Sequence, residues 1–140
     1  MRRDEGGQAV VESILLCLVL LVPLIWMLGV LAELHRGALA AGAAARDAGF
    51  AAASAPDLRA ASDAIDIAVR QAFVDHELDP ERASVRWTSA PGLERGGIVE
   101  VRVEYPVPVA RIPFVDRVAG PSIRIDARHA ARIDPFRSRG

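Results

Sequence analysis

The sequence has one cysteine, no lysine and no asparagine, and only 5% of its 140 residues are aromatic. A single cysteine, Cys17, excludes an intrachain disulfide and any CxxC metal or redox pair. All 17 basic residues are arginine, but the net charge is -1, so the chain lacks the basic excess of nucleic-acid-binding proteins. Phosphate loops, dinucleotide fingerprints and metal-ligand spacings are missing as well. We therefore expect a structural protein rather than an enzyme, with no cofactor, no metal and no nucleic-acid partner.

What the sequence does contain is a long apolar run. The nineteen residues from Ile14 to Ala32 carry no charge, and thirteen of them are Leu, Ile or Val. As a helix this run spans close to the roughly 30 Å of bilayer hydrocarbon, and its insertion is favourable by on the order of 4–8 kcal/mol. We expect one transmembrane helix in contact with membrane lipid. Pro23, in the middle of the run, removes one backbone hydrogen bond and is expected to kink the helix.

The charges that flank the run predict its orientation. Arg2 and Arg3 precede it, whereas Glu33, His35 and Arg36 follow it. The positive-inside rule then keeps the N-terminus in the cytoplasm and places the C-terminal part outside the cytoplasmic membrane. We expect a single-pass membrane protein.

A cleaved secretory signal peptide is the main alternative to a permanent anchor. Signal peptides have an apolar region of about 7–15 residues that ends at small residues. The run here is longer, although cleavage after Ala40 or Ala45 would fit the small-residue rule. Glu12 argues against this alternative, because an acid at the head of the apolar region has no purpose in a secretory signal.

Glu12 is the residue with the clearest functional signal. A carboxylate at the edge of hydrocarbon is costly unless a partner compensates its charge, and such acids are functional candidates. The alternative is that Glu12 only marks the polar end of the helix at the level of the lipid headgroups. If the chain were cut between Gly7 and Gln8, Glu12 would be the fifth residue of the new chain, about 6 Å along the helix from the new amine. In a bundle of such helices, the carboxylate would neutralise the amine of a neighbouring subunit in a setting of low dielectric constant.

This arrangement resembles the type IV pilin-like proteins and, more specifically, the TadE-like family of minor pseudopilins of the tight-adherence (Flp) pilus system. The resemblance lies in the GQAVVES motif from Gly7 to Ser13, in the Leu-rich run with its proline, in Glu33 and, more weakly, in the strand from Ser122 to Asp134. It implies that Gly7 is the cleavage-site glycine, Gln8 the mature N-terminus and Glu12 the assembly carboxylate. Ser13 departs from the family, which often has an aromatic residue after the Glu.

The resemblance also implies a set of partners and a role. The partners would be other pilins and pseudopilins, the inner-membrane pilus assembly platform and the prepilin peptidase. The protein would initiate or regulate pilus assembly, and so contribute to adhesion, without ATPase activity of its own. Two other classes stay open: a secreted binding module released from a signal peptide, and a permanently anchored envelope protein that holds a partner outside the membrane.

The alanine-rich stretch after the run predicts that the helix continues to about Ala53. Its small side chains either allow another helix to approach closely or form a spacer encouraged by a GC-rich genome. A break follows at Ser54–Pro56, where Ser54 and Asp57 have the spacing of a capping box. A second helix is predicted from Asp57 to Leu78 and ends before Pro80.

The core face of this second helix is predicted to contain apolar residues at helical spacing: Leu58, Ala61, Ile65, Ala68, Val69, Ala72 and Phe73. Its solvated face holds Arg59, Asp63, Asp66 and Arg70. Asp75, His76 and Glu77 are adjacent in sequence, so they cannot all face one metal ion from a helix.

Alternation with period two predicts three strands after the second helix. They lie at Ser84–Thr88, at Ile98–Tyr105 and around Ile123–Arg128, with charged residues on one face and apolar residues on the other. The stretch Pro106–Pro121 has four prolines and is predicted to be an irregular loop. Its apolar residues either cover the core or bind a partner: Ile112, Phe114, Val115 and Val118.

The expected fold class is α+β and pilin-like. A transmembrane helix extends into the Ala-rich helix, and a second helix packs on a three-stranded antiparallel meander. The predicted organisation is a cytoplasmic leader (1–7), the transmembrane and extended helix (8–53) and a soluble extracytoplasmic domain (54–140).

Overall fold

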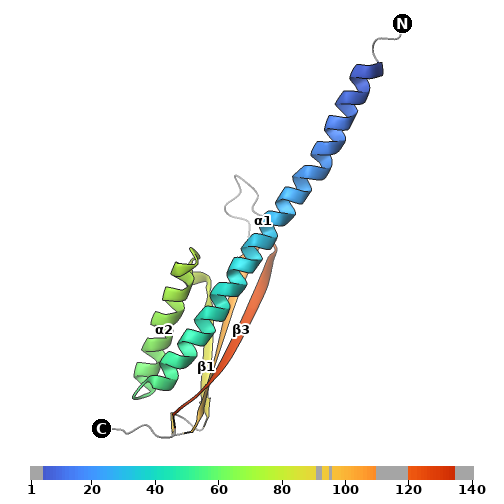
Figure 1. Ribbon diagram of the computed structural model, residues 1–140. Helices are drawn as coiled ribbons and strands as arrows, with labels where there is room; N and C mark the ends of the chain where they lie inside the picture. The colour runs from blue at the N-terminus through green and yellow to red at the C-terminus, as the bar shows by residue number, and fades with distance from the viewer. Residues whose placement is uncertain (1–4, 91–92, 95, 110–119, 135–140) are drawn as a thin grey trace. The chain divides into compact units, whose positions relative to one another are not determined.

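The computed structural model describes residues 5–90, 93–94, 96–109 and 120–134, and side chains from Gly7 onward. In chain order its elements are α1 (Glu5–Ser54), α2 (Leu58–Asp75), the short 3-10 helix η1 (Pro80–Arg82), β1 (Ser84–Ala90), β2 (Ile98–Pro108) and β3 (Ser122–Arg132) (Figure 1). This α+β layout confirms the predicted fold class. The chain divides into two compact units, Met1–Glu33 and Leu34–Gly140.

The first unit contains the part of α1 with the apolar run. From Gly7 to Gly29 every described side chain is exposed to solvent. The apolar run is not buried against any other described part of the chain. This helix is long and apolar enough to cross a membrane, as predicted.

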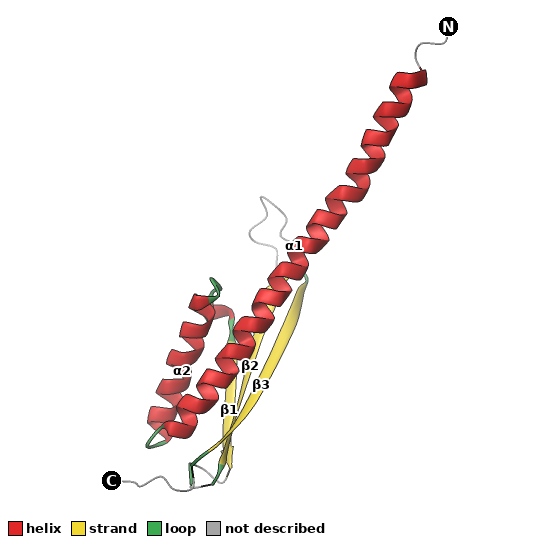
Figure 2. Ribbon diagram, viewed as in Figure 1, coloured by secondary structure: helices red, strands yellow, loops and turns green. Residues whose placement is uncertain are grey.

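The second unit is built on a three-stranded antiparallel sheet in the order β1-β2-β3. Its helices are α2 and the part of α1 from Leu34 onward, and Figure 2 shows both lying along the sheet. Both helices contact the same sheet face, because Gly37 and Phe73 each lie against Tyr105 of β2. The predicted meander packed on a second helix is therefore correct, and the second half of α1 covers the sheet beside that helix.

Small residues bring α1 close to the sheet. Six alanines of this helix segment are at most 1% exposed: Ala40, Ala41, Ala44, Ala45, Ala48 and Ala52. A Cβ atom added to Gly37 would lie 2.9 Å from Ile125 Cδ1 and 2.9 Å from Val107 Cγ2, and one added to Gly49 would lie 2.9 Å from His129 Cδ2. The two glycines therefore lie against side chains of the sheet, and the six alanines belong to a core that α2 and the sheet share, so this stretch is closely packed and is not a solvated spacer.

Gly37→Ala is therefore expected to destabilise the second unit. Alanine gains about 1 kcal/mol of helix propensity over glycine, but the new methyl group would overpack a buried contact at a cost of about 1–3 kcal/mol. Val107 is 2% exposed and β-branched, so it has little room to move. The net effect should be a loss of up to about 2 kcal/mol in the free energy of unfolding, measured by urea titration of the chain in detergent.

Gly42→Ala is the matched control on the same helix. No atom lies within 4 Å of a Cβ built on Gly42, so only the propensity gain remains and the variant should be more stable by about 0.5–1 kcal/mol. Equal effects of the two substitutions would contradict close packing of α1 at Gly37.

The start of α2 differs in detail from the prediction. Asp57 is the N-cap residue, and its Oδ1 accepts a hydrogen bond from the Ala60 backbone N–H at 2.8 Å. The predicted capping box, with Ser54 as the cap, is wrong because Ser54 is still the last residue of α1. Leu58, expected in the core, is 56% exposed, since it lies at the first helical position and off the buried stripe. The buried stripe otherwise follows the prediction: Ala61, Ile65, Val69, Ala72 and Phe73.

The end of α2 comes at Asp75, three residues before the predicted end. Glu77 has a φ of 56°, in the left-handed region. The Glu77 N–H donates to the Val74 carbonyl and the Leu78 N–H donates to the Phe73 carbonyl, both at 2.9 Å. This pair of bonds is a Schellman motif, which stops the helix before the proline does. Asp79 instead caps η1 by accepting a hydrogen bond from the Glu81 N–H at 3.0 Å.

The described strands are longer than predicted, and β2 contains two prolines. The sequence predicts an irregular loop at Pro106 and Pro108, but both residues lie in β2, opposite Arg124 and Ser122. Even-numbered residues of β2 direct their backbone N–H groups away from β3, and β1 on that side ends its pairing at Glu104. The missing proline N–H groups therefore break no ladder bond. Residues 110–119, which include the apolar residues of the predicted loop, lie outside the described part.

Candidate functional site

The candidate site is the start of α1, where the sequence predicts processing and assembly residues. Gly7, Gln8 and Glu12 all lie on this helix and are exposed. The helical backbone begins at Glu5, so the bond between Gly7 and Gln8 lies within a helical turn. A Cβ atom added to Gly7 would meet nothing within 4 Å. Arg2 and Arg3, on which the predicted orientation depends, lie outside the described residues.

Glu12 has apolar neighbours. On a helix its side chain lies next to the residues three and four positions further on, Leu15 and Leu16, which are 61% and 62% exposed. Among the described residues no hydrogen bond or ion pair to the Glu12 carboxylate is found. The adjacent Ser13 is paired, since its hydroxyl donates to the Ala9 carbonyl at 2.8 Å. The carboxylate is therefore a charge without a partner among the described residues, at the head of an apolar surface.

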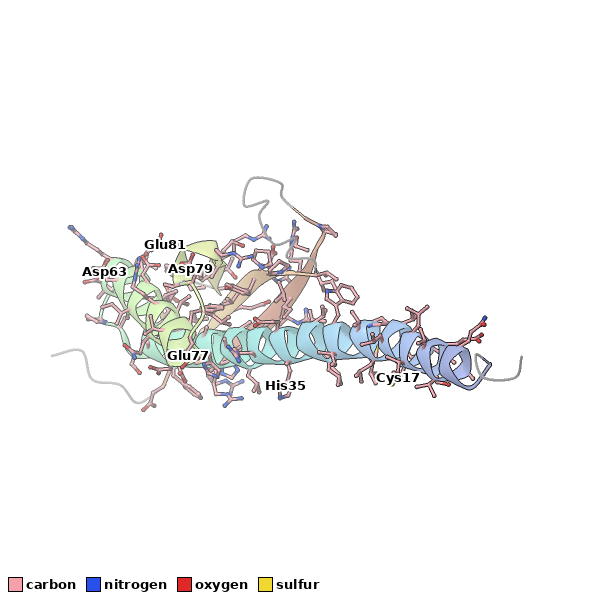
Figure 3. The ribbon with its side chains drawn as sticks, turned by 90° about the horizontal axis from the view of Figure 1, so that it is seen from above. Cys17, His35, Asp63, Glu77, Asp79 and Glu81 are labelled. Atoms are coloured by element: carbon pink, nitrogen blue, oxygen red, sulfur yellow. The ribbon has the colours of Figure 1, made fainter. Side chains whose placement is uncertain are left out.

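The apolar surface continues along the helix from Glu12 to Glu33. Large side chains such as Val11, Leu20 and Ile25 are each about 60% exposed, and an exposed apolar surface of this extent is typical of a site that contacts lipid or another protein. Cys17 is exposed on the same surface, and Figure 3 shows it on this helix. Pro23 lies inside α1, where the Val19 carbonyl loses its usual donor four residues on. The bend expected at Pro23 stays a prediction.

The histidines of the described chain do not converge. His35 is exposed on α1, and the His76 Nδ1 lies 2.8 Å from the Ala72 carbonyl at the end of α2. His129 lies in β3 on the face that the helices cover, with its ring 5.2 Å from that of Phe50. Its Nε2 atom is buried and has no hydrogen-bond partner in the described structure.

The residues flanking His76 contact separate partners. Asp75 accepts a hydrogen bond from Gln71 at 2.6 Å, and Glu77 lies 4.0 Å from the Arg36 guanidinium. Within the described residues no group of three His, Cys, Asp or Glu side chains is arranged to hold a metal ion.

A shallow surface depression of about 200 Å³ lies between α2, η1 and β1. The ion pair between Arg70 and Glu81, at 2.6 Å, is part of its lining, and both side chains are more than 60% exposed. Asp79 and Glu81 lie close together at this end of the unit in Figure 3. A solvated ion pair of this kind contributes roughly 0–1 kcal/mol to stability. The geometry of this depression does not point to a catalytic group among its described lining residues.

The charged outer face of the sheet is a feature that the sequence reveals only in part. Alternation predicted that one face of each strand is charged, but the register shows that Arg86, Arg102 and Arg128 lie directly opposite one another across the three strands. Like charges in such a row repel. Arg86 pairs with Glu104, and the Arg102 Nε lies 3.7 Å from Asp126 Oδ2. The register between the strands creates this row of arginines, and the sequence of a single strand does not reveal that register.

Comparison with known proteins adds no relative, since no family model, no curated protein and no solved structure matches this chain.

Proposed function

We propose that this chain is a TadE-like minor pseudopilin, a membrane-anchored structural component of tight-adherence (Flp) pilus assembly. The apolar part of α1 crosses the cytoplasmic membrane once, with the N-terminus in the cytoplasm and the α+β unit outside. The partners are other pilins and pseudopilins, the assembly platform, the prepilin peptidase and membrane lipid. The GQAVVES motif and the α+β layout expected from the resemblance support this proposal.

The observation that carries the proposal is the position of Glu12. Its carboxylate has no partner among the described residues and stands at the start of a helix surface that is apolar and uncovered. An acid at this depth needs a compensating cation. Removal of residues 1–7 would create one, the α-amino group of Gln8, and a neighbouring subunit displaced by about one turn of helix would bring that amine to Glu12.

The second unit supports a structural role for a different reason. Its α1 segment buries its small residues in the core of that unit, whereas the segment from Val10 to Leu31 leaves its large apolar residues exposed. The two parts of α1 thus differ in what they can bind: the exposed apolar part is free to contact lipid or the helices of other pilins. A polymer of helices anchored in this way requires no chemistry from the folded unit.

The mature N-terminus is the test of this proposal. When the full gene is expressed together with the prepilin peptidase, mass spectrometry of the membrane-extracted chain should find Gln8 as the first residue. Expression without the peptidase is the control and should leave residues 1–7 in place. A chain that begins after Ala40 or Ala45 would instead identify a secreted binding module. An intact Met1 or Arg2 in the presence of the peptidase would identify a permanently anchored envelope protein without a pilus role.

A further inference from the structure

The outer face of the sheet carries more arginines than carboxylates. The even-numbered residues of the three strands point to this outer face. Among them are five arginines and three acids, which give an excess of two positive charges. These residues are Arg86, Arg102, Arg124, Arg128, Arg132, Glu100, Glu104 and Asp126. Neither helix covers this face, since both contact the opposite one.

The positive excess is concentrated on β3. Glu104 of β2 pairs with Arg86 of β1, and Asp126 of β3 pairs with Arg102 of β2. Among the described residues, neither acid therefore forms an ion pair with an arginine of β3. Arg124, Arg128 and Arg132 are exposed, and none of them forms an ion pair with a residue in the described part of the chain. They are spaced four residues apart along one strand, with Asp126 and Ala130 between them.

The same three arginines have backbone groups without a hydrogen-bond partner in the described part of the chain. The Ile133 N–H donates to the Gly97 carbonyl and the Val109 N–H donates to the Pro121 carbonyl, both at 2.9 Å. In an antiparallel ladder the bonded pairs recur at every second residue, so the odd-numbered residues of β3 bond to β2. The even-numbered residues direct their N–H and C=O groups outward. β3 is an edge strand of the three-stranded sheet, and no backbone hydrogen bond to that outer edge is found among the described residues.

We propose that the outer edge of β3 binds an extended acidic segment of another protein as a fourth strand of the sheet. The backbone of Arg124, Arg128 and Arg132 pairs with the incoming strand, and their guanidinium groups meet its carboxylates on the solvated face. Directly opposite residues have Cβ atoms about 4.5–5.5 Å apart, which is within reach of an Arg–carboxylate bond. β-strand addition combines affinity from the main chain with specificity from alternate side chains.

The register specifies the pattern of the partner. A carboxylate is favoured opposite each of the three arginines, and hence at every fourth residue of the incoming strand. A basic or small residue suits the position opposite Asp126. A second copy of this chain fits less well, because its own sheet face carries the same positive excess and would bring arginines together. β1 fits less well than β3, because it is shorter and its Arg86 already pairs with Glu104.

The experiment is a binding titration with the full-length chain in nonionic detergent. The probe is a fluorescent peptide of alternating valine and threonine in which a glutamate replaces every second threonine, and anisotropy measures its binding. The glutamate peptide should bind at least tenfold more tightly than its counterpart with lysine in place of glutamate. It should also bind more tightly than the same glutamate peptide with N-methylated backbone amides, which cannot complete a ladder. Raising the salt concentration should weaken binding, since the contacts are exposed.

Variants of β3 identify the site. Arg128→Ala should weaken binding by up to about fivefold, which corresponds to an exposed charge pair, and the triple variant of Arg124, Arg128 and Arg132 to Ala by at least tenfold. Arg59→Ala is the matched control, because it removes one exposed arginine from α2. Circular dichroism checks the fold, and if the triple variant does not fold, Arg128→Gln replaces it.

Each contrary outcome overturns the proposal. Equal binding of the lysine peptide removes the charge complementarity, and equal binding of the N-methylated peptide assigns the face to anion binding without strand addition. Unchanged affinity in the triple variant places the peptide elsewhere. Self-association of the chain that the triple variant abolishes would make a second copy the occupant. These outcomes do not depend on N-terminal processing, so the experiment tests strand addition independently of the proposed pilus role.

Discussion

Phe73→Ala is expected to lower the free energy of unfolding of the second unit by about 3–5 kcal/mol. The Phe73 side chain is fully buried, and its ring stacks on that of Tyr105 with the centroids 4.7 Å apart. Truncation removes the transfer free energy of the ring and leaves a cavity between α2 and β2, where Ile65 and Val103 are also at most 1% exposed. Domains of this size are stable by about 5–15 kcal/mol, so the loss is a large fraction of the total.

Urea unfolding in detergent, followed by the fluorescence of Trp87 on β1, measures this effect. The second tryptophan, Trp26, lies in the apolar part of α1 and is replaced by Phe in all samples. Val74→Ala is the matched control, because the neighbouring side chain is 55% exposed and its truncation should cost less than about 0.5 kcal/mol. A similar loss in both variants would contradict the core position of Phe73.

The elements that sequence reasoning predicted well are those in which periodicity and burial agree. Ile65, Val69 and Phe73 recur at helical spacing, and all three are buried. Val99, Val101 and Val103 alternate with charged residues, and all three are fully buried in β2. The apolar run was equally clear, since its length and composition decide its helical character without any tertiary contact.

The errors arise where a local rule meets a structural feature that the sequence does not display. Pro106 predicted a loop, because proline cannot donate a hydrogen bond to a neighbouring strand. In β2, however, its nitrogen points to the side where β1 ends its pairing at Glu104. On that side the Arg82 guanidinium donates a hydrogen bond to the Pro106 carbonyl at 2.9 Å. Proline at position 80 predicted a helix end, but Glu77 in the left-handed region ends α2 earlier. At Pro106 the position of the neighbouring strand decides the outcome, and the sequence does not display it. At the end of α2 the left-handed residue is a glutamate, so the sequence lacks the glycine that usually signals this motif.

The candidate sites differ in the same way. Glu12 could be singled out from the sequence, because a charge next to an apolar run needs no structure to be recognised. The arginine edge of β3 could not, since it requires the register of β2 with β3 and the position of β3 at the edge of the described sheet. Alternating charges alone are typical of any solvated sheet face.

The second large effect is expected for Glu12→Gln, and it rests on the proposed pilus role. The substitution should leave membrane insertion intact, because an amide is cheaper than a carboxylate to place at the edge of hydrocarbon. It removes the charge that would pair with the amine of Gln8 in a neighbouring subunit. At 4 Å and an effective dielectric constant of about 20, such a pair contributes about 4 kcal/mol. Part of this is offset by desolvation, so co-purification with other pilins should fall by roughly tenfold or more.

Quantitative co-purification from detergent extracts, with the mature N-terminus measured in the same sample, separates assembly from processing. Glu33→Gln is the matched control, because it removes the same charge at the other end of the apolar segment, where the side chain is already half-buried. If Glu12→Gln chains start at Gln8 and still recover their partners in full, the carboxylate has no assembly role. If they retain residues 1–7, the loss of recovery reflects failed processing, and the pairing of Glu12 with the freed amine is tested instead by Glu12→Asp. Aspartate keeps the charge but shortens its reach by one methylene group, so partial recovery by this variant alone would show that the carboxylate acts through its charge.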